Sequence, residues 1–177
     1  MELENPIMMT VPEIEFLYEI VSLLPANSTV LEIGTAWGGS SEVMAKANSL
    51  IRIFTIDLFE DGVRYGKGIV ETCIEVSKNL SKFDNVTVMC GNAMTDFQDW
   101  NTEIDLYFED GAHEDPALIT NLTRWTAFLK PGGYLLMHDH NEFSPDVEKN
   151  IQRLVKLNKF EIVKTVESLT LLKSKEK

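Results

Sequence analysis

The sequence has few basic residues, few cysteines and no long apolar run. Its 177 residues include 16 Lys and Arg against 28 Asp and Glu, which gives a formal net charge of −12. Nucleic acids and anionic membranes attract proteins mainly through Lys and Arg, so this charge argues against both as partners. No stretch reaches the roughly 18 apolar residues of a membrane span, and Met1 to Thr10 lacks the basic start of a signal peptide. We therefore expect a soluble, cytoplasmic protein.

The two cysteines, Cys73 and Cys90, do not have the CxxC spacing of metal-binding or redox motifs. This argues against a disulfide framework and a cysteine-based metal site and fits a reducing compartment. With 44% apolar residues, the chain can bury one core but is too short for two ordinary domains. We expect a single domain over residues 1–177, in which residues 1–27 form a lead-in and an N-terminal helix.

Apolar residues recur alternately at helix and strand spacing along the chain. Pro131, Gly132 and Gly133 interrupt this pattern after a helix, and the last two strands are too close together for a crossover helix, so they should form an antiparallel hairpin. The pattern predicts an α/β fold, a Rossmann-like, doubly wound, mostly parallel seven-stranded sheet with a C-terminal antiparallel hairpin. The expected helices are 10–24, 40–47, 69–80, 118–129 and 144–155, and the expected strands are 29–33, 51–56, 86–90, 104–109, 134–137, 160–166 and 169–172.

A glycine-rich turn follows the first predicted strand, where such sheets bind ligands. Its glycines let the backbone approach a ligand, and Ser40 and Ser41 can offer donors to a carboxylate or phosphate. The turn has neither the GxGxxG spacing of dinucleotide folds nor the lysine of a P-loop, which disfavours NAD and nucleoside triphosphates. The alternative is an ordinary glycine-rich turn between a strand and a helix.

Polar residues also follow the second and third predicted strands. Asp57 can accept hydrogen bonds from both hydroxyls of a ribose, although an aspartate at a strand end is often a solvated turn residue. Gly91, Asn92 and Ala93 offer a small surface with one polar side chain, which suits an adenine edge. A turn stabilised by glycine and asparagine explains the same residues.

These segments, with Val30 to Gly34 before them and Leu129 to Gly133 after them, resemble in order the class I S-adenosylmethionine-dependent methyltransferases. The resemblance covers nearly the whole chain and implies S-adenosylmethionine as the cofactor. It implies that Glu32 and Gly34 lie near the methionine part, that Asp57 binds the ribose, and that Asn92 and Ala93 lie beside the adenine. The remaining cofactor-binding residues that it implies are Trp37, Gly38, Ser40, Leu58 and Asp110.

All three histidines of the chain lie after the fourth and fifth predicted strands, in segments 108–115 and 138–141. Neighbouring strands lie about 5 Å apart, so Asp110 and Asp139 can converge on one cation. Alternatively, the two aspartates cap strand ends and the histidines occupy polar loops.

This arrangement resembles the metal-dependent small-molecule O-methyltransferases, particularly the macrocin-type branch that acts on sugar hydroxyls. The resemblance implies Asp110 and Asp139 as metal ligands and His113 as the general base. The third ligand position falls on His140, where the family usually has Asp or Asn. The expected divalent cation is Mg, Mn or Fe, and an imidazole ligand favours the transition metals over Mg²⁺. His138 is either a buried strand-end residue or a partner that orients a ligand.

The expected function is divalent-metal-assisted O-methylation of a small hydroxylated acceptor. The alternatives are a metal-dependent hydrolase that uses the His/Asp cluster, and a non-catalytic cofactor-binding module. A nucleic-acid amino methylase is disfavoured, because Glu109 to Ala112 does not match the Asn/Asp-Pro-Pro-aromatic segment of those enzymes. Little of this short chain can cover a substrate, so we expect a lid at Leu58 to Lys67 and self-association into a homo-oligomer.

Overall fold

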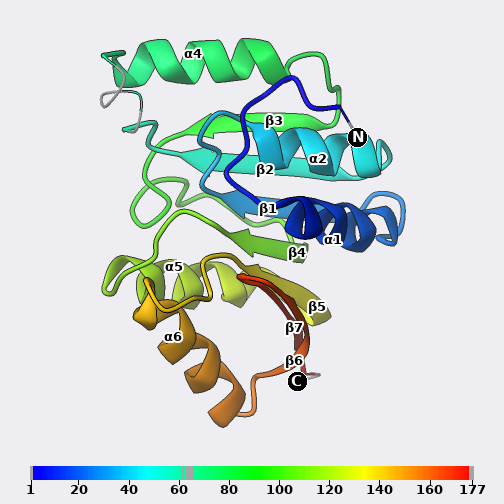
Figure 1. Cartoon of the computed structure of the whole chain (residues 1–177), viewed down its shortest axis with the longest axis vertical. Helices are drawn as coiled ribbons and strands as arrows, with labels where there is room; N and C mark the ends of the chain where they lie inside the picture. The colour runs from blue at the N-terminus through cyan, green and yellow to red at the C-terminus, as the bar shows by residue number, and fades with distance from the viewer. Residues whose placement is uncertain (1, 61, 63–65, 176–177) are drawn as a thin grey trace.

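The computed structural model describes residues 2–60, 62 and 66–175, and its centre is a seven-stranded sheet of order β3-β2-β1-β4-β5-β7-β6 (Figure 1). Strands β1 to β5 are parallel to one another, while β7 runs antiparallel to both β5 and β6. The predicted doubly wound sheet with a C-terminal hairpin is confirmed. The strands are β1 (Thr29–Ile33), β2 (Arg52–Asp57), β3 (Val86–Cys90), β4 (Ile104–Glu109), β5 (Leu129–Met137), β6 (Phe160–Val166) and β7 (Leu169–Ser174).

Helices cover both faces of the sheet, and the alternation of side chains along each strand explains why. In β1, Val30 packs into the cluster formed with α1 and α2, while Leu31 packs into the opposite cluster with α5 and α6. Both faces of the central strands are therefore apolar, as in other parallel sheets. The helices are α1 (Val11–Ser22), α2 (Gly39–Ala47), α4 (Ile69–Leu80), α5 (Ala117–Trp125) and α6 (Pro145–Lys156), with a short 3₁₀ helix at Thr126–Phe128. None of these helices has the length and apolar character that a bilayer crossing demands.

Strand β5 begins earlier than the sequence pattern indicates. The sequence predicts that the proline and glycines at 131–133 break the preceding helix, but that helix ends at Trp125 and these residues lie inside β5 as an irregularity. Ile104 pairs with Leu129, and two residues later Leu106 pairs with Tyr134, so β5 carries extra residues relative to β4. Gly132 adopts φ +74°, which is the left-handed region that glycine enters without steric cost.

Residues 2–10, here called the N-terminal strap, lie against α2 before the chain enters α1 (Figure 1). The buried carboxylate of Glu42 accepts hydrogen bonds from the backbone N–H of Glu4 at 3.1 Å and of Asn5 at 2.8 Å. The Asn5 side chain donates a further bond to it at 2.8 Å. The lead-in that the sequence presents as a polar segment is thus fixed to the body of the fold.

Replacing Gly39 with alanine should disturb this contact. A Cβ at Gly39 would lie 2.3 Å from the Pro6 carbonyl oxygen and 2.6 Å from Ile7 Cβ. We expect Gly39→Ala to lower the free energy of unfolding by about 1 to 3 kcal/mol, as overpacked sites do. Gly68→Ala is the matched control, because a Cβ there meets nothing within 4 Å. Equal stability of the two variants in urea titrations would show that the strap is not held against α2.

Candidate functional site

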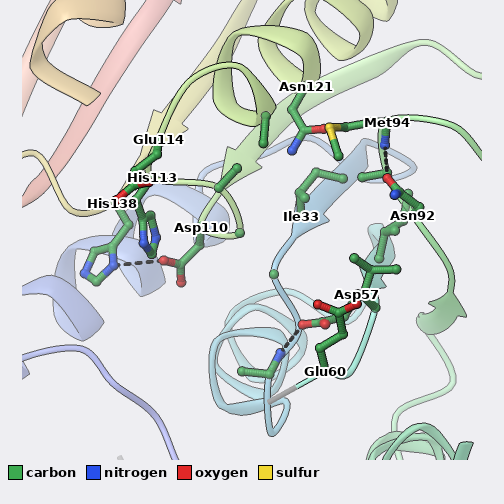
Figure 2. A pocket seen from close by; sticks show the side chains of 18 of the residues that line it. Ile33, Asp57, Glu60, Asn92, Met94, Asp110, His113, Glu114, Asn121 and His138 are labelled. Atoms are coloured by element: carbon green, nitrogen blue, oxygen red, sulfur yellow. Dashed lines mark hydrogen bonds and ion pairs between the residues drawn. The ribbon is translucent and has the colours of Figure 1, made fainter. Parts of the chain in front are cut away.

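A cavity of about 750 Å³ lies at the carboxyl ends of the parallel strands (Figure 2). This volume is within the range of small-molecule and cofactor sites. The wall also includes residues that the sequence did not single out, among them Met8 of the strap, Met94 and Asn121. The predicted site residues that the structure brings together here are Gly34, Asp57, Leu58, Asn92, Ala93, Asp110, His113 and Asp139. Of the predicted lid, residues 61 and 63–65 lie outside the described part of the chain.

Gly34 lets the turn after β1 lie directly on the loop after β4. Its φ of +100° is strained for other residues, and a Cβ there would be 2.4 Å from the Asp110 carbonyl oxygen. The Asp110 N–H in turn donates to the Ile33 carbonyl at 2.9 Å. The backbones of the two loops are therefore in direct contact, and together they form part of the cavity wall.

Asp57, at the end of β2, joins two loops around the cavity. Its Oδ2 accepts a hydrogen bond from the Ala36 N–H at 2.7 Å, and its Oδ1 accepts one from the Phe59 N–H at 2.6 Å. Figure 2 shows this carboxylate on the cavity wall beside Glu60. Asp57 is thus held where a ligand with hydroxyl groups could meet it.

Four predicted cofactor residues lie outside this cavity. Glu32 is fully buried, and its carboxylate accepts hydrogen bonds from the hydroxyls of Ser40, Ser41 and Thr55. Burial raises the pKa of Glu32 to about 7, against the opposing effect of these hydroxyls. Trp37 and Ser40 instead line a smaller cavity of about 30 Å³ beneath the strap, and Gly38 faces Leu80.

Asp110, His113 and Asp139 form a compact cluster at one end of the large cavity. One potential ligand atom from each lies within 4.8 Å of the others, and His113 Nε2 is 2.9 Å from Asp139 Oδ2. Contact with His113, and then with His138, holds the pKa of Asp139 well below its usual range, while burial raises that of Asp110. Contact with Asp139 raises the pKa of His113.

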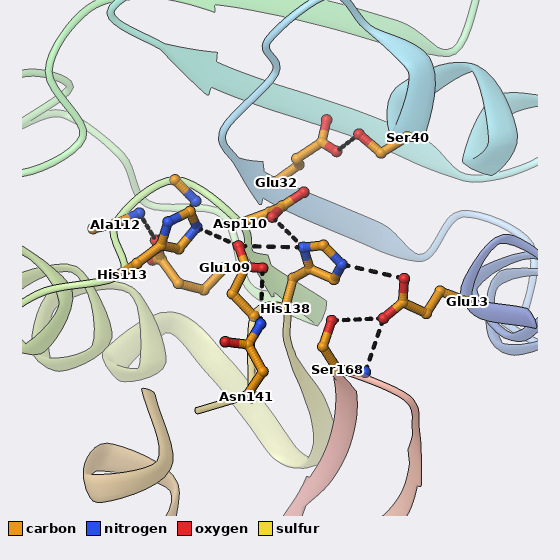
Figure 3. A network of polar contacts seen from close by, with 12 residues as sticks. Glu13, Glu32, Ser40, Glu109, Asp110, Ala112, His113, His138, Asn141 and Ser168 are labelled. Atoms are coloured by element: carbon orange, nitrogen blue, oxygen red, sulfur yellow. Dashed lines mark hydrogen bonds and ion pairs between the residues drawn. The ribbon is translucent and has the colours of Figure 1, made fainter. Parts of the chain in front are cut away.

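The ring of His138 lies between this cluster and Glu13 of α1 (Figure 3). Its Nδ1 lies 2.9 Å from Asp110 Oδ1, and its Nε2 faces Glu13 Oε2 at 3.5 Å. Burial disfavours the charged ring, but Asp110 and Asp139 raise the pKa of His138 to about 11. Burial would raise the pKa of Glu13, yet hydrogen bonds from Ser168 and Thr10 and the charge of His138 lower it to about 2. His138 is therefore a cation held between carboxylates.

The structure does not bring His140 to the two aspartates. Its Nδ1 lies 2.7 Å from the Thr170 hydroxyl, and its Nε2 contacts the Glu148 carboxylate. The reason lies in the backbone, since Asp139 adopts φ +57° and the His140 N–H pairs with the Ser168 carbonyl at 2.9 Å. The chain thus turns between residues 139 and 140, and His113 occupies the place beside the aspartates.

Glu109 was not among the predicted site residues, although it shapes the turn that carries Asp110 and His113. Its buried carboxylate accepts hydrogen bonds from the Tyr107 hydroxyl and from the Ala112 N–H, the latter at 3.0 Å (Figure 3). Burial raises its pKa to about 7. A glutamate that directly follows the apolar run Leu106 to Phe108 at the end of a buried strand is the sequence signal that could have identified it.

The sheet order, the glycine turn after β1 and the acidic residue after β2 together define a class I S-adenosylmethionine-dependent methyltransferase. More specifically, the chain belongs to the family described as methyltransferase domain, whose model matches residues 31–140. No curated protein matches the chain.

Solved structures with the same fold share little sequence with this chain. A candidate caffeoyl-CoA O-methyltransferase from Staphylococcus aureus has 19% identity and a TM-score of 0.74, with 97% of this chain and 86% of that chain covered. A candidate O-methyltransferase from Klebsiella pneumoniae has 19% identity and a TM-score of 0.72, with 97% and 84% covered. An rRNA methylase from Streptococcus thermophilus has 15% identity and a TM-score of 0.67, with 96% and 100% covered. At these identities the similarity shows the fold.

Proposed function

We propose that this methyltransferase transfers the methyl group to an oxygen of a small hydroxylated acceptor with the help of a divalent cation. The observation that supports this is the cluster of Asp110, His113 and Asp139, which shares one cavity with Asp57. Figure 2 shows the histidines at one end of that cavity and Asp57 and Asn92 at the other. The cavity thus offers separate places for a reacting hydroxyl and for a nucleoside.

The donor set of the cluster fits a divalent cation. Two carboxylates and one imidazole have ligand atoms within 4.8 Å of one another. Carboxylate oxygens suit Mg²⁺ and Mn²⁺, and an imidazole suits Mn²⁺ and Fe²⁺. In our proposal Asp110 and Asp139 hold the cation, and their partner His138 fixes the direction of the Asp110 carboxylate. When bound, such a cation lowers the pKa of an adjacent acceptor hydroxyl.

The side chains around the proposed cation accept the proton of the acceptor hydroxyl and position the cofactor. His113 Nε2 is buried, lies 2.9 Å from Asp139 Oδ2 and makes no aligned hydrogen bond to any described residue, so that in the neutral ring this nitrogen has a free lone pair. It is therefore placed to accept the proton of the acceptor hydroxyl. Asp57 holds the ribose of the cofactor, and Ala93 lies beside its adenine, so that the sulfonium methyl points toward the cluster. Transfer is an in-line displacement that requires the hydroxyl oxygen about 3 Å from the methyl carbon.

A small acceptor fits the charge of the molecule better than a nucleic acid does. The fold occurs in an rRNA methylase, but a net charge of −12 opposes binding to phosphates. A screen of vicinal diols, catechols and sugars with methyl-labelled cofactor, with and without chelator, tests the proposal. Labelling of RNA instead, or hydrolysis of a substrate without methyl transfer, would contradict it.

Cofactor binding can be tested separately from turnover. We expect one site for S-adenosylhomocysteine in calorimetry, and Asp57→Ala should weaken binding by about 1 to 3 kcal/mol because ribose hydroxyls lose their acceptor. Asp84→Ala removes an exposed carboxylate outside the cavity and should leave the affinity unchanged. Wild-type affinity in a folded Asp57→Ala variant would remove Asp57 from the ribose site.

A further inference from the structure

Asn121 presents an unpaired hydrogen-bond acceptor to the large cavity. It lies on the inward face of α5 with Leu118, Leu122 and Trp125, and only 4% of it is exposed. Its Oδ1 is buried and has no hydrogen-bond partner among the described residues. Figure 2 shows Asn121 near Met94 and Asn92, at the end of the cavity away from His113 and His138.

The orientation of this amide is fixed by Glu109. Asn121 Nδ2 donates to Glu109 Oε1 at 3.4 Å, and the same oxygen accepts bonds from the N–H of Ala112 at 3.0 Å and of Gly111 at 3.3 Å. Backbone N–H groups can only donate, so Glu109 Oε1 is an acceptor and the amide nitrogen must face it. A flipped amide would place two acceptors together, so the amide atom of this cavity-lining residue that is left unpaired is the oxygen.

The surroundings of Asn121 suit a flat ring with a donor on its edge. Ala93, Met94, Ala112 and Ala117 line the same cavity with small or apolar side chains. The Trp125 indole N–H donates to the Ala93 carbonyl at 3.1 Å, which ties the loop after β3 to α5. This bond holds the loop after β3 against α5, and the unpaired Asn121 Oδ1 costs free energy until a donor arrives.

Asn92, which the sequence predicted for the adenine edge, is engaged within its own loop. Its Oδ1 accepts a hydrogen bond from the Met94 N–H at 2.8 Å, which closes a turn. One acceptor position of Asn92 Oδ1 is therefore occupied within the loop, whereas Asn121 Oδ1 has no partner among the described residues.

We propose that Asn121 Oδ1 accepts a hydrogen bond from the exocyclic amino group of the cofactor's adenine and thereby selects a 6-aminopurine over a 6-oxopurine. The inference rests on the cofactor placement proposed above, in which the adenine lies beside Ala93. A 6-oxo ring would turn an oxygen toward the Asn121 oxygen, so two acceptors would face each other.

The test compares S-adenosylhomocysteine with its deaminated analogue, S-inosylhomocysteine, by calorimetry. Wild-type protein should bind the adenosyl compound about tenfold or more tightly than the inosyl compound, because a buried acceptor loses its partner in the second. In Asn121→Leu this preference should fall to about threefold or less, mainly through weaker binding of the adenosyl compound. Thr123→Ala, on the exposed side of α5, should keep the wild-type preference.

Three results would overturn the inference. Equal affinity of wild-type protein for the two compounds does so without any variant. An undiminished preference in Asn121→Leu, or in Asn121→Ala if the leucine variant does not fold, would mean that the oxygen meets only water. Both of these leave S-adenosylmethionine as the cofactor, whereas failure of wild-type protein to bind either compound would also remove the cofactor placement.

Discussion

Asp139→Asn is expected to reduce methyl transfer about a thousandfold or more while S-adenosylhomocysteine still binds, because the variant loses several kcal/mol of charge stabilisation at the cation. Asparagine is the informative replacement. Asp139 has φ +57°, a region that asparagine tolerates and alanine does not, so the backbone should stay in place. Asp139 also carries the negative charge that faces His113 and His138. The variant therefore changes charge without changing the turn.

Asp99→Asn is the control for this experiment, because it removes one negative charge from an exposed position outside the cavity. It should retain full turnover. Rates measured against added Mg²⁺, Mn²⁺ and Fe²⁺, before and after chelation, show whether a cation is required. Turnover that survives exhaustive chelation, or a wild-type rate in Asp139→Asn, would leave the two aspartates as strand-end caps.

The second large effect is expected at His113. His113→Gln should lower kcat by about a hundredfold or more at neutral pH, since loss of a general base typically has that effect. The rate should recover in part as the pH rises, because the acceptor then ionises without help. The affinity for Mn²⁺ should change little. A loss of Mn²⁺ affinity of about tenfold or more would instead identify His113 as a metal ligand.

His140→Gln is the matched control for His113→Gln. The structure places the His140 ring between Thr170 and Glu148, so this variant should turn over at nearly the wild-type rate. Loss of activity and of Mn²⁺ affinity in His140→Gln would restore His140 as the third ligand. The two variants therefore show which histidine acts with Asp110 and Asp139: His140, as the sequence predicts, or His113, as the structure places it.

The sequence predicts the meeting of Asp110 and Asp139 because each follows a strand of one parallel sheet, and such strands end at a common edge. It does not predict the direction of His140, which depends on the left-handed backbone of Asp139. Aspartate enters that region less readily than glycine, and here the next residue is held by the bond from the His140 N–H to the Ser168 carbonyl in the turn between β6 and β7.

Contacts between segments that are distant in sequence account for the other differences between the sequence-based predictions and the structure. Glu32 belongs to a strand pattern that fits a cofactor site, but Ser40 turns its hydroxyl toward Glu32 and closes the carboxylate off. Asn121 occupies an apolar helix face, and only its partner Glu109 shows which amide atom meets the cavity. Hydrogen-bond direction between such segments is a property of the folded chain, so periodicity and spacing do not reveal it.

The Glu13 carboxylate accepts hydrogen bonds from the backbone N–H and the hydroxyl of Ser168, at 2.9 and 2.6 Å, across 155 positions of sequence (Figure 3). The same side chain faces His138. The amino-terminal part of the chain is synthesised first, so Glu13 of α1 can contact Ser168 only after the turn between β6 and β7 has been synthesised. Before that, the Glu13 carboxylate lacks the hydrogen bonds from Ser168 that hold it beside His138. The surroundings of His138 are thus completed by a segment that is synthesised after both aspartates of the cluster.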